Sequence, residues 1–476
     1  MHVPKNLQVL LTLATVALLV NYVETMVVPA LPTIQSDFST TSSLVAWVTS
    51  AYLIVGSAAS PLFGKLGDLY GKKRLYLISL GFYIISVALA GFSTNIYFLI
   101  FARALQGLGF SVFPLGLAII TDTFPKERVA TAQGVLSGTI GIGTALGLVV
   151  GAYIDQDLGW QYAFHIAALL GILLLVVSSK TLESDVSRPK EALDIVGSAL
   201  LMTGISLLLV YTTEGPYLGW FSALELILLA LGAVLTIGFF VYESRARSPL
   251  IQLGLLKIRN VFVSNIVGIV SSLMLLMMFF AVIYYTEIPP PFGLGLDVIS
   301  AGLTLAPATV VMLVVGPIVG RLTGRIGPKP VLLFGSLVCA LGFYLFLLNR
   351  STSSVLVEDV IVTGIGMISI IVPIVNMVAV SLPEDSRAVG LGMNTMLRNL
   401  GGAIGPVVAT TIMTSYQTAY ILTTHGELFY AGSFPLAIGF NTIFKVDILI
   451  SVITFALSAF SKNYTTRSLK LNSAYA

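Results

Sequence analysis

Long apolar runs alternate with short polar segments along almost the whole chain. Each run has roughly 20 residues or more, which is enough for a helix rising ~1.5 Å per residue to cross about 30 Å of hydrocarbon. The weakest patterns are the glycine-rich run at 389–416 and the stretch 417–440 that follows it. Fourteen transmembrane helices are predicted, at residues 7–31, 44–64, 75–92, 96–120, 129–154, 160–178, 193–212, 222–242, 261–286, 298–320, 330–349, 355–380, 389–416 and 441–460.

Composition supports an all-α integral membrane protein that lies in a lipid bilayer. Only 10% of the residues are charged and 56% are hydrophobic, a balance that excludes a soluble domain of this length. The first run follows Lys5 but is too long for a signal peptide, and no small-x-small cleavage site comes after it. We therefore expect an uncleaved first helix.

Charge placement predicts the orientation of the helices. Because cytoplasmic loops retain lysine and arginine, we place the N-terminus inside. The inner segments then hold every basic residue except Arg103, Arg350, Arg398 and Lys445. The outer loops carry acids such as Asp37, Asp155, Asp157 and Asp297. Both termini are predicted to be cytoplasmic, in the plasma membrane. The net charge of +3 reflects this sidedness and does not imply a nucleic-acid partner.

Two short motifs occur twice, which predicts an internal duplication. The glycine-bracketed basic turn at 64–74 recurs in degraded form at 320–329, and the segment 124–130 is echoed at 382–388 with nearly the same offset. Helices one to six therefore pair with helices nine to fourteen. The seventh and eighth have no counterpart and are predicted to form an inserted two-helix hairpin. The predicted units are an N-terminal six-helix bundle at 1–190, the hairpin at 191–250 and a C-terminal six-helix bundle at 251–476.

The segment 64–74 resembles the signature loop between the second and third helices of the major facilitator superfamily. The resemblance lies in Gly64, Leu66, Asp68, Gly71, Lys72, Lys73 and Arg74. The stretch 103–109 resembles the fourth-helix motif of the superfamily. Thr25 with Ala30-Leu31-Pro32 resembles the first helix of its drug:proton antiporters, and the stretch 398–405 resembles the thirteenth helix of its fourteen-helix branch. In the fifth helix, Leu148 and Ala152 stand where the antiporter signature has proline and glycine.

The resemblance implies a secondary active transporter in which two bundles rock around a midplane cavity. We expect proton-coupled export of amphipathic or drug-like compounds by a functional monomer. The alternative is a dedicated symporter or antiporter of one metabolite, such as an organic acid, sugar or lipid. No enzyme or cofactor is expected, because the chain lacks a Gly-x4-Gly-Lys-Ser/Thr loop and clustered acids or histidines at one surface. The single Cys339 excludes a cysteine-based metal site.

Three charged residues and one amide are candidates for proton coupling or substrate binding. Glu24 lies about 10 Å below the predicted outer surface, where a carboxylate is costly unless paired, hydrated or protonated. Arg103 lies at the same depth in the fourth helix and suggests an ion pair with Glu24, while Gln106 shares its face. Arg398 lies near mid-membrane and must face the interior or a wet cavity. The alternative for Glu24 is an interfacial acid at a frayed helix end, and for Arg103 and Arg398 it is a purely structural role.

The signature loop predicts a gate on the inner side. Gly64 and Gly71 permit tight turns, and Asp68 can accept hydrogen bonds from a helix N-terminus across the seam. Lys72, Lys73 and Arg74 hold the loop inside against anionic lipid. The resemblance implies an intracellular latch with Asp122 as the partner of Arg74. The alternative is that the loop's positive charges only set the orientation of the helices in the membrane, which would explain the basic residues but not Asp68.

Glycines spaced four residues apart predict close helix packing. Gly143, Gly147 and Gly151 form a stripe on the fifth helix, and Gly401 and Gly405 repeat it on the thirteenth. We expect these faces to meet at the interface of the two halves. The ninth helix offers methionines and aromatic residues suited to a promiscuous apolar site, although lipid-facing positions would also explain them. They are Met274, Met277, Met278, Phe279, Phe280, Tyr284 and Tyr285.

Overall fold

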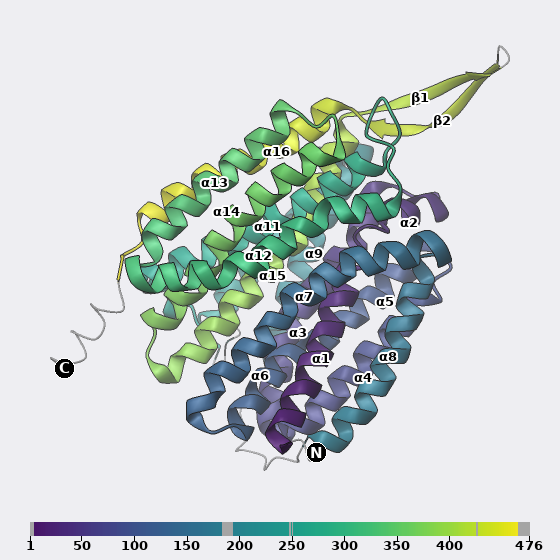
Figure 1. The fold of residues 1–476 in the computed structure, drawn as a ribbon. Coiled ribbons are helices and arrows are strands. Elements are labelled where there is room, and N and C mark those ends of the chain that lie inside the picture. The colour runs from purple at the N-terminus through teal and green to yellow at the C-terminus, as the bar shows by residue number, and fades with distance from the viewer. Residues whose placement is uncertain (1–3, 183–193, 247–248, 250, 425–426, 465–476) are drawn as a thin grey trace.

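The computed structural model describes residues 4–182, 194–246, 249, 251–424 and 427–464, and the statements below refer to these residues. Eight α-helices form an N-terminal group (Figure 1). The short 3-10 turn Gly109–Ser111 joins two of them, α5 and α6, into one span. The eight helices are α1 (Lys5–Thr25), α2 (Leu31–Asp37), α3 (Ser42–Tyr70), α4 (Lys72–Gly91), α5 (Ile96–Leu108), α6 (Val112–Thr123), α7 (Lys126–Leu158) and α8 (Trp160–Thr181).

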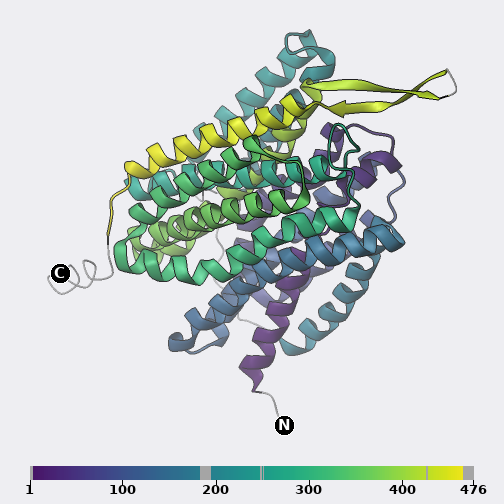
Figure 2. The ribbon, with the colours of Figure 1, turned by 45° about the horizontal axis from the view of Figure 1, so that its top comes forward.

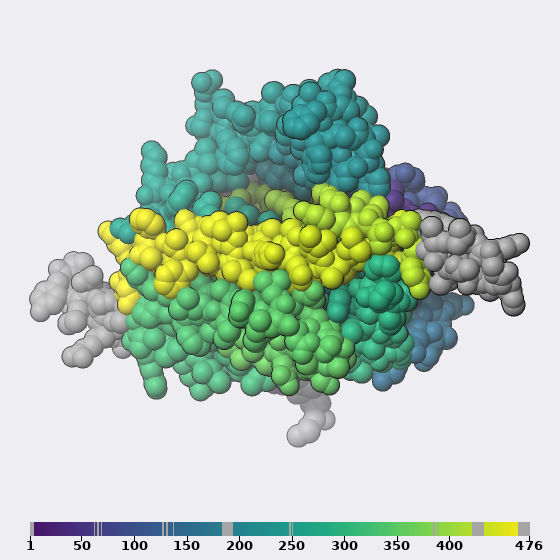
Figure 3. All heavy atoms as spheres, turned by 90° about the horizontal axis from the view of Figure 1, so that it is seen from above, coloured from purple at the N-terminus to yellow at the C-terminus, as the bar shows by residue number. Residues whose placement is uncertain are grey.

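Two helices follow as a pair, and six more form a C-terminal group. The pair projects from the rest of the molecule (Figure 3) and consists of α9 (Ile195–Leu218) and α10 (Ala223–Glu243). A 3-10 turn at Leu255–Lys257 precedes the C-terminal group. Its helices are α11 (Arg259–Glu287), α12 (Val298–Ile326), α13 (Pro328–Leu348), α14 (Ser353–Ser381), α15 (Glu384–Ser415) and α16 (Ala437–Ala459).

The predicted fourteen-helix membrane architecture is confirmed. Thirteen spans of the described residues are long and apolar enough to cross a membrane. The more polar α15 is the fourteenth, which explains why its run gave a weak pattern. The division into units at residues 190 and 250 stays a prediction, because the first boundary lies in the undescribed segment 183–193 and the second falls on an undescribed residue.

Two glycines show the duplication at the level of the backbone. Gly71 ends α3 with φ 95°, and Gly327 ends α12 with φ 91°. This left-handed region is strained for residues with a Cβ, so glycine is needed where each long helix turns sharply into the next. The two positions correspond in the repeated basic turn. The same local chemistry therefore produces the same helix-to-helix connection in both halves.

A two-stranded antiparallel ribbon follows α15. The sequence analysis did not predict it. Its strands are β1 (Gln417–Thr424) and β2 (Glu427–Pro435), and its register shifts between Tyr420 and Ile421. The ribbon extends beyond the helices (Figure 1). At its base, the Phe292 ring stacks on Phe434 with centroids 5.5 Å apart and meets Tyr420 edge-on at 5.3 Å. These rings fasten the ribbon to the loop between α11 and α12.

The two groups of helices meet along two seams, α3 with α15 and α7 with α12. Among the described residues, the hydrogen bonds across these seams lie toward the end that carries the ribbon, which we call the ribbon end. The Ser43 and Thr414 hydroxyls are 3.2 Å apart, and the Ser50 hydroxyl donates to the Ala403 carbonyl over 2.6 Å. The helices of the two groups separate toward the opposite end of the molecule, where α1 begins and α16 ends (Figure 2). We call this the terminal end.

The pair α9–α10 contacts both groups at the ribbon end. The Trp47 indole N–H of α3 donates to the Thr213 hydroxyl over 3.0 Å. The Thr411 hydroxyl of α15 donates to the neighbouring Thr212 carbonyl, also over 3.0 Å. Through these bonds α9 bridges the seam between α3 and α15, so the inserted pair is not an independent appendage.

The seam contact at Ser43 and Thr414 predicts an efficient cross-link. In a background in which the single cysteine is removed by Cys339→Ser, we expect the pair Ser43→Cys and Thr414→Cys to form a disulfide with mild oxidant, because the two hydroxyls already touch. Mobility on a non-reducing gel after proteolysis between the two groups measures the yield. Each single cysteine is the control, and a pair that stays reduced would contradict this closed seam.

Candidate functional site

Arg103 is the most completely buried charge of the N-terminal group. It lies on α5 and is 0% exposed. Its Nε donates to the Val48 carbonyl of α3 over 2.9 Å, and its Nη1 donates to the Gln106 side-chain oxygen over 2.8 Å. The guanidinium also lies over the Tyr52 ring, 4.7 Å from its centroid. A buried guanidinium is tolerated only with such partners, so α3 and α5 together build this position.

The same cluster leaves three polar atoms without a hydrogen-bond partner in the described part of the chain. They are Arg103 Nη2, Gln106 Nε2 and the Tyr52 hydroxyl. Orphaned buried polar atoms are costly and concentrate where water, an ion or a substrate completes the network. The cluster is therefore equipped to bind something more than its own side chains.

Glu24 faces this cluster from the last turn of α1. Glu24 is half-buried, and Arg103 is the cation that acts on its carboxylate electrostatically. The Tyr83 hydroxyl of α4 donates to the Val20 carbonyl over 3.2 Å, one turn below Glu24 on α1. Tyr52 and Tyr83 both lie within electrostatic range of Glu24 and Arg103. Four helices thus bring the predicted acid, base and amide together.

The direct ion pair predicted between Glu24 and Arg103 is not formed in the described part of the chain. The guanidinium is instead held by Val48 and Gln106 through Nε and Nη1, and its Nη2 has no partner in the described part of the chain. Glu24 is left as a carboxylate near a cation but without a fixed partner. Such an arrangement allows the carboxylate to exchange a proton without first breaking an ion pair.

Arg398 lies on α15 in the C-terminal group, partly accessible and packed against α11. A Cβ at Gly268 of α11 would come within 2.8 Å of its Cγ. One turn earlier, the Asn394 amide donates to the Ser264 carbonyl and to the Asn265 side-chain oxygen, both over 3.2 Å. Arg398 Nε has no partner among the described residues. The structure places Arg398 in the α11–α15 packing and does not join it to the Glu24 cluster.

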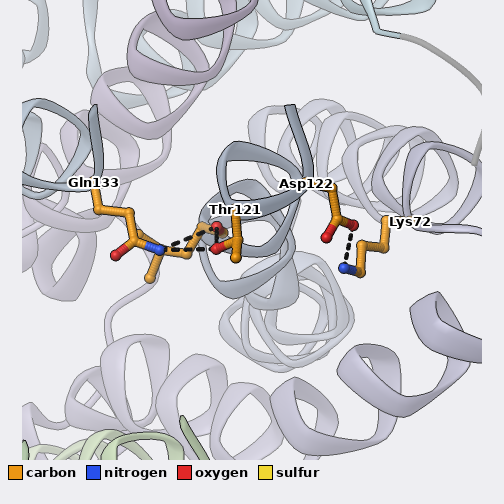
Figure 4. Close-up of polar contacts among 5 residues, drawn as sticks. Lys72, Thr121, Asp122 and Gln133 are labelled. Atoms are coloured by element: carbon orange, nitrogen blue, oxygen red, sulfur yellow. Dashed lines mark hydrogen bonds and ion pairs between the residues drawn. The ribbon is translucent and has the colours of Figure 1, made fainter. Parts of the chain in front are cut away.

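At the terminal end, Lys72 and Asp122 form an ion pair between α4 and α6 (Figure 4). The partner of Asp122 is therefore Lys72 and not Arg74, whose side chain is exposed. Next to it, the Gln133 amide of α7 donates to the Thr121 hydroxyl of α6 over 3.0 Å. The predicted latch residues Gly64 and Asp68 fall outside the side chains that the structure describes, and Lys73 is half-buried beside Lys72.

The glycine stripes hold helices together within each half, and their expected place between the halves is wrong. A Cβ on Gly143 would lie 2.6 Å from the Leu18 carbonyl of α1, and one on Gly151 would meet Met26 at 2.6 Å. Gly401 and Gly405 of α15 face the Ile269 and Leu273 carbonyls of α11 in the same way. The reason is that an absent Cβ lets backbones touch, which serves permanent packing inside a bundle.

Two buried acids of the C-terminal group were missed by the sequence analysis. Asp359 on α14 is 3% exposed and Asp447 on α16 is 0% exposed. Asp359 Oδ2 and both oxygens of Asp447 have no partner among the described residues. Their signal was available, because each is an acid inside a predicted transmembrane run. Among the described residues, no group of three or more His, Cys, Asp or Glu is placed to hold a metal ion.

The methionines and aromatic residues of α11 are largely buried inside the protein, so the lipid-facing interpretation does not apply to them. Met274, Met277, Met278 and Phe280 are each 0% exposed. Tyr285 is partly accessible and lies under the Arg350 guanidinium, 5.3 Å from the ring centroid.

Comparison with known proteins gives a consistent result. A family profile described as Major Facilitator Superfamily matches residues 13–406. The chain is 29% identical to the multidrug transporter protein MdtP of Bacillus subtilis, over 82% of this chain and 72% of that one. It is 26% identical to the tetracenomycin C resistance and export protein of Streptomyces glaucescens, over 85% and 76%. It is 28% identical to the riboflavin transporter RibZ of Clostridioides difficile, over 92% and 93%.

A solved structure shares the fold. A bacterial homolog of the human lysosomal transporter Spinster, described as inward-facing and unoccupied, superposes with a TM-score of 0.67. The superposition covers 96% of this chain and 97% of that one, at 14% identity.

The backbone contact between α7 and α1 predicts a steep cost for a single methyl group. Gly147→Ala would drive a Cβ against Thr25, to 2.6 Å from the Tyr22 carbonyl and 2.9 Å from the Met26 N. We expect a loss of about 1–3 kcal/mol in stability, read as a lower melting temperature of purified protein. Gly138→Ala on the same helix is the matched control, because nothing lies within 4 Å of its Cβ. Equal melting temperatures for the two variants would contradict the packing.

Proposed function

The chain belongs to the major facilitator superfamily, and we propose that it is a proton-coupled exporter of amphipathic, drug-like compounds that works by alternating access. The observation that carries the proposal is Glu24, a half-buried acid beside the fully buried Arg103. The multidrug and antibiotic exporters among its relatives support the substrate class. A multi-pass membrane location follows from the fourteen helices.

In this proposal Glu24 carries the proton. A neutral carboxylic acid is tolerated in a low-dielectric interior more easily than a carboxylate, and the nearby Arg103 favours the charged form. Bringing a cationic or amphipathic substrate near the cluster changes this balance and releases the proton. Arg103, Gln106 and Tyr52 supply the unfilled hydrogen-bonding positions that water or substrate would complete. Proton and substrate thereby compete for one site.

The two groups of helices would act as the moving bodies. Glycine-mediated packing keeps α1 with α7 and α11 with α15, so each group moves as a unit. The seams are held at the ribbon end by few polar contacts, such as Ser50 to Ala403. We assign the terminal end to the cytoplasm on the basis of its lysines and arginines. In that orientation the present structure is closed outside, and the Lys72–Asp122 pair lies beside the inner gate.

Arg398 and the buried surface of α11 are the proposed contributions of the C-terminal group. Methionine and aromatic side chains adapt to differently shaped apolar molecules, which suits a broad specificity. Arg398 packs on Gly268 of α11 and keeps one orphaned nitrogen. A substrate bound between the groups would therefore meet Glu24 from one side and the α11–α15 face from the other.

A dedicated metabolite carrier is the second candidate, and a specific observation favours it. The match to the riboflavin transporter RibZ covers 92% of this chain and 93% of RibZ, at 28% identity. A dedicated carrier would discriminate strongly between its substrate and unrelated amphipathic molecules, because buried hydrogen-bonding groups reject analogues that leave them unpaired.

Glu24→Gln should uncouple transport from the proton gradient. In proteoliposomes with an imposed pH gradient, we expect gradient-driven dye efflux to fall at least tenfold, because the amide cannot carry a proton. Substrate exchange without a gradient should be retained. Asp157→Asn, an exposed acid at the ribbon end, is the control and should transport normally. Undiminished coupling in Glu24→Gln would remove this residue from the proposed role.

Substrate breadth separates the two candidate functions. We expect the wild-type protein to move several unrelated amphipathic cations with KM values within about tenfold of one another, and riboflavin no better than these. Uptake into inverted vesicles, measured for each compound separately, tests this. Transport of riboflavin or another single metabolite alone, with no dye movement under any gradient, would favour the dedicated carrier.

A further inference from the structure

Helix α16 carries a polar stripe along its buried face. Asp447, Ser451, Thr454 and Ser458 follow one another at i, i+4, i+7 and i+11. All four side chains are 0% exposed, whereas Leu449 and Val452 on the other face are exposed. The helix therefore buries its polar face and exposes apolar side chains. Each buried polar group in a membrane helix costs free energy unless it has a hydrogen-bond partner. The stripe therefore requires a reason.

Most of the stripe is not satisfied by the protein itself. Both carboxylate oxygens of Asp447, the Thr454 hydroxyl and the Ser458 hydroxyl have no partner among the described residues. Ser451 is the exception: its hydroxyl donates to the Asp447 carbonyl over 2.8 Å and meets the Met274 sulfur at 3.4 Å. Asp447 lies about 15 Å from the start of α16 at ~1.5 Å per residue, in the middle of the span.

Helix α11 extends the stripe on a second side. It runs antiparallel to α16, and two contacts fix their register: Ser451 with Met274, and Asn260 with Lys462. Between these fixed points α11 buries Ser264 and Ser271. The Ser264 hydroxyl also lacks a partner among the described residues.

Helix α13 closes a third side. The Phe346 ring stacks on Phe444 with centroids 4.6 Å apart, and Lys329 Nζ donates to the Ala459 carbonyl over 2.6 Å near the terminal end. Between these two levels α13 buries Ser336 and Cys339. The Cys339 thiol lies 3.9 Å from the Thr363 carbonyl and is therefore turned toward α14, within electrostatic range of Asp447. Ser264, Ser271 and Ser336 are the hydroxyl groups that α11 and α13 add to the column.

The repeat offers an internal comparison. Helix α8 occupies the place of α16 in the N-terminal half, being the last helix of its group. Over the inner part of its span, residues 169–177, it carries only leucine, isoleucine, valine and glycine, and its buried hydroxyl there is Ser178. Because α8 packs without a polar stripe, the fold does not require one at this position. The column in the C-terminal half serves something other than packing.

We propose that Asp447 is a second proton-binding site of this transporter, reached from the terminal end along the column formed by Ser458, Thr454 and the facing hydroxyls of α11 and α13. Water and hydroxyl groups pass a proton inward, an O–H bond forms on the Asp447 carboxylate, and the reverse transfer returns the proton. Neither carboxylate oxygen of Asp447 has a partner among the described residues, so protonation is what neutralises it. The site deepens the proposed proton coupling by adding a store separate from Glu24.

Infrared spectroscopy of the purified protein in lipid tests the proposal without any substrate. The wild type should show the carbonyl band of a protonated carboxylic acid that is missing from Asp447→Asn, and the band should shift when H2O is replaced by D2O. In the double variant Thr454→Val, Ser458→Ala, we expect this exchange to slow at least tenfold, because the relay is interrupted. Ser178→Ala on α8 is the matched control and should exchange at the wild-type rate.

Three results would overturn the proposal: no band that depends on Asp447, a band that never exchanges, or an unchanged exchange rate in the double variant. If the double variant does not fold, the single variant Thr454→Val, which preserves side-chain shape, is measured in its place. It should also slow the exchange at least tenfold, and an unchanged rate would overturn the proposal. Dye transport does not enter the measurement. An exchanging Asp447 band in a protein that moves no dye would therefore count against the proposed export function and leave the second proton site standing.

Discussion

Direct backbone contact between α1 and α7, repeated between α11 and α15, is the interaction on which the rest of the architecture depends. The glycines of α7 and α15 remove the Cβ atoms that would hold each helix pair apart. In a membrane, where lipid competes equally for apolar side chains, such close approach is a main source of helix association. Each half therefore contains one closely packed helix pair, and Gly302 of α12 also brings its backbone close to the Leu148 carbonyl across the α7–α12 seam.

The seam between α3 and α15 is held by contacts of a different kind. Across α3 and α15, small hydroxyl groups such as Ser43, Ser50 and Thr414 make the contacts, and they lie toward the ribbon end. Hydroxyl groups can exchange one partner for another, or for water, at little cost, whereas the glycine contacts cannot be altered without separating backbones. A molecule built in this way can open along its seams while its halves stay intact. The inserted pair α9–α10 bonds to both sides of one seam, and its bonds to Trp47 and Thr411 must be compatible with that opening.

Much of this could be predicted from the sequence, because lipid imposes simple rules on length and charge. The fourteen spans followed from apolar run length, and the repeat followed from two short motifs, one of which places a left-handed glycine after a long helix in both of its copies. The expected partners were less accurate. Arg103 binds Val48 and Gln106 because its own helix and the facing one supply acceptors closer than Glu24, which a depth calculation does not resolve. The glycine stripes were recognised but assigned to the wrong neighbour, since spacing along one helix does not identify the helix opposite.

The missed acids show where single-motif reasoning fails. Glu24 was predicted from its depth in the first helix, whereas Asp447 lies in a run that also holds Lys445 and has no motif around it. Its importance emerges only when Ser451, Thr454 and Ser458 are placed on the same helical face. The two halves thus share packing but differ in buried chemistry: an arginine-centred cluster in one, and an acid at the end of a hydroxyl column in the other. A scaffold that repeats its backbone while varying its buried charges can divide proton handling between its halves without changing how they move.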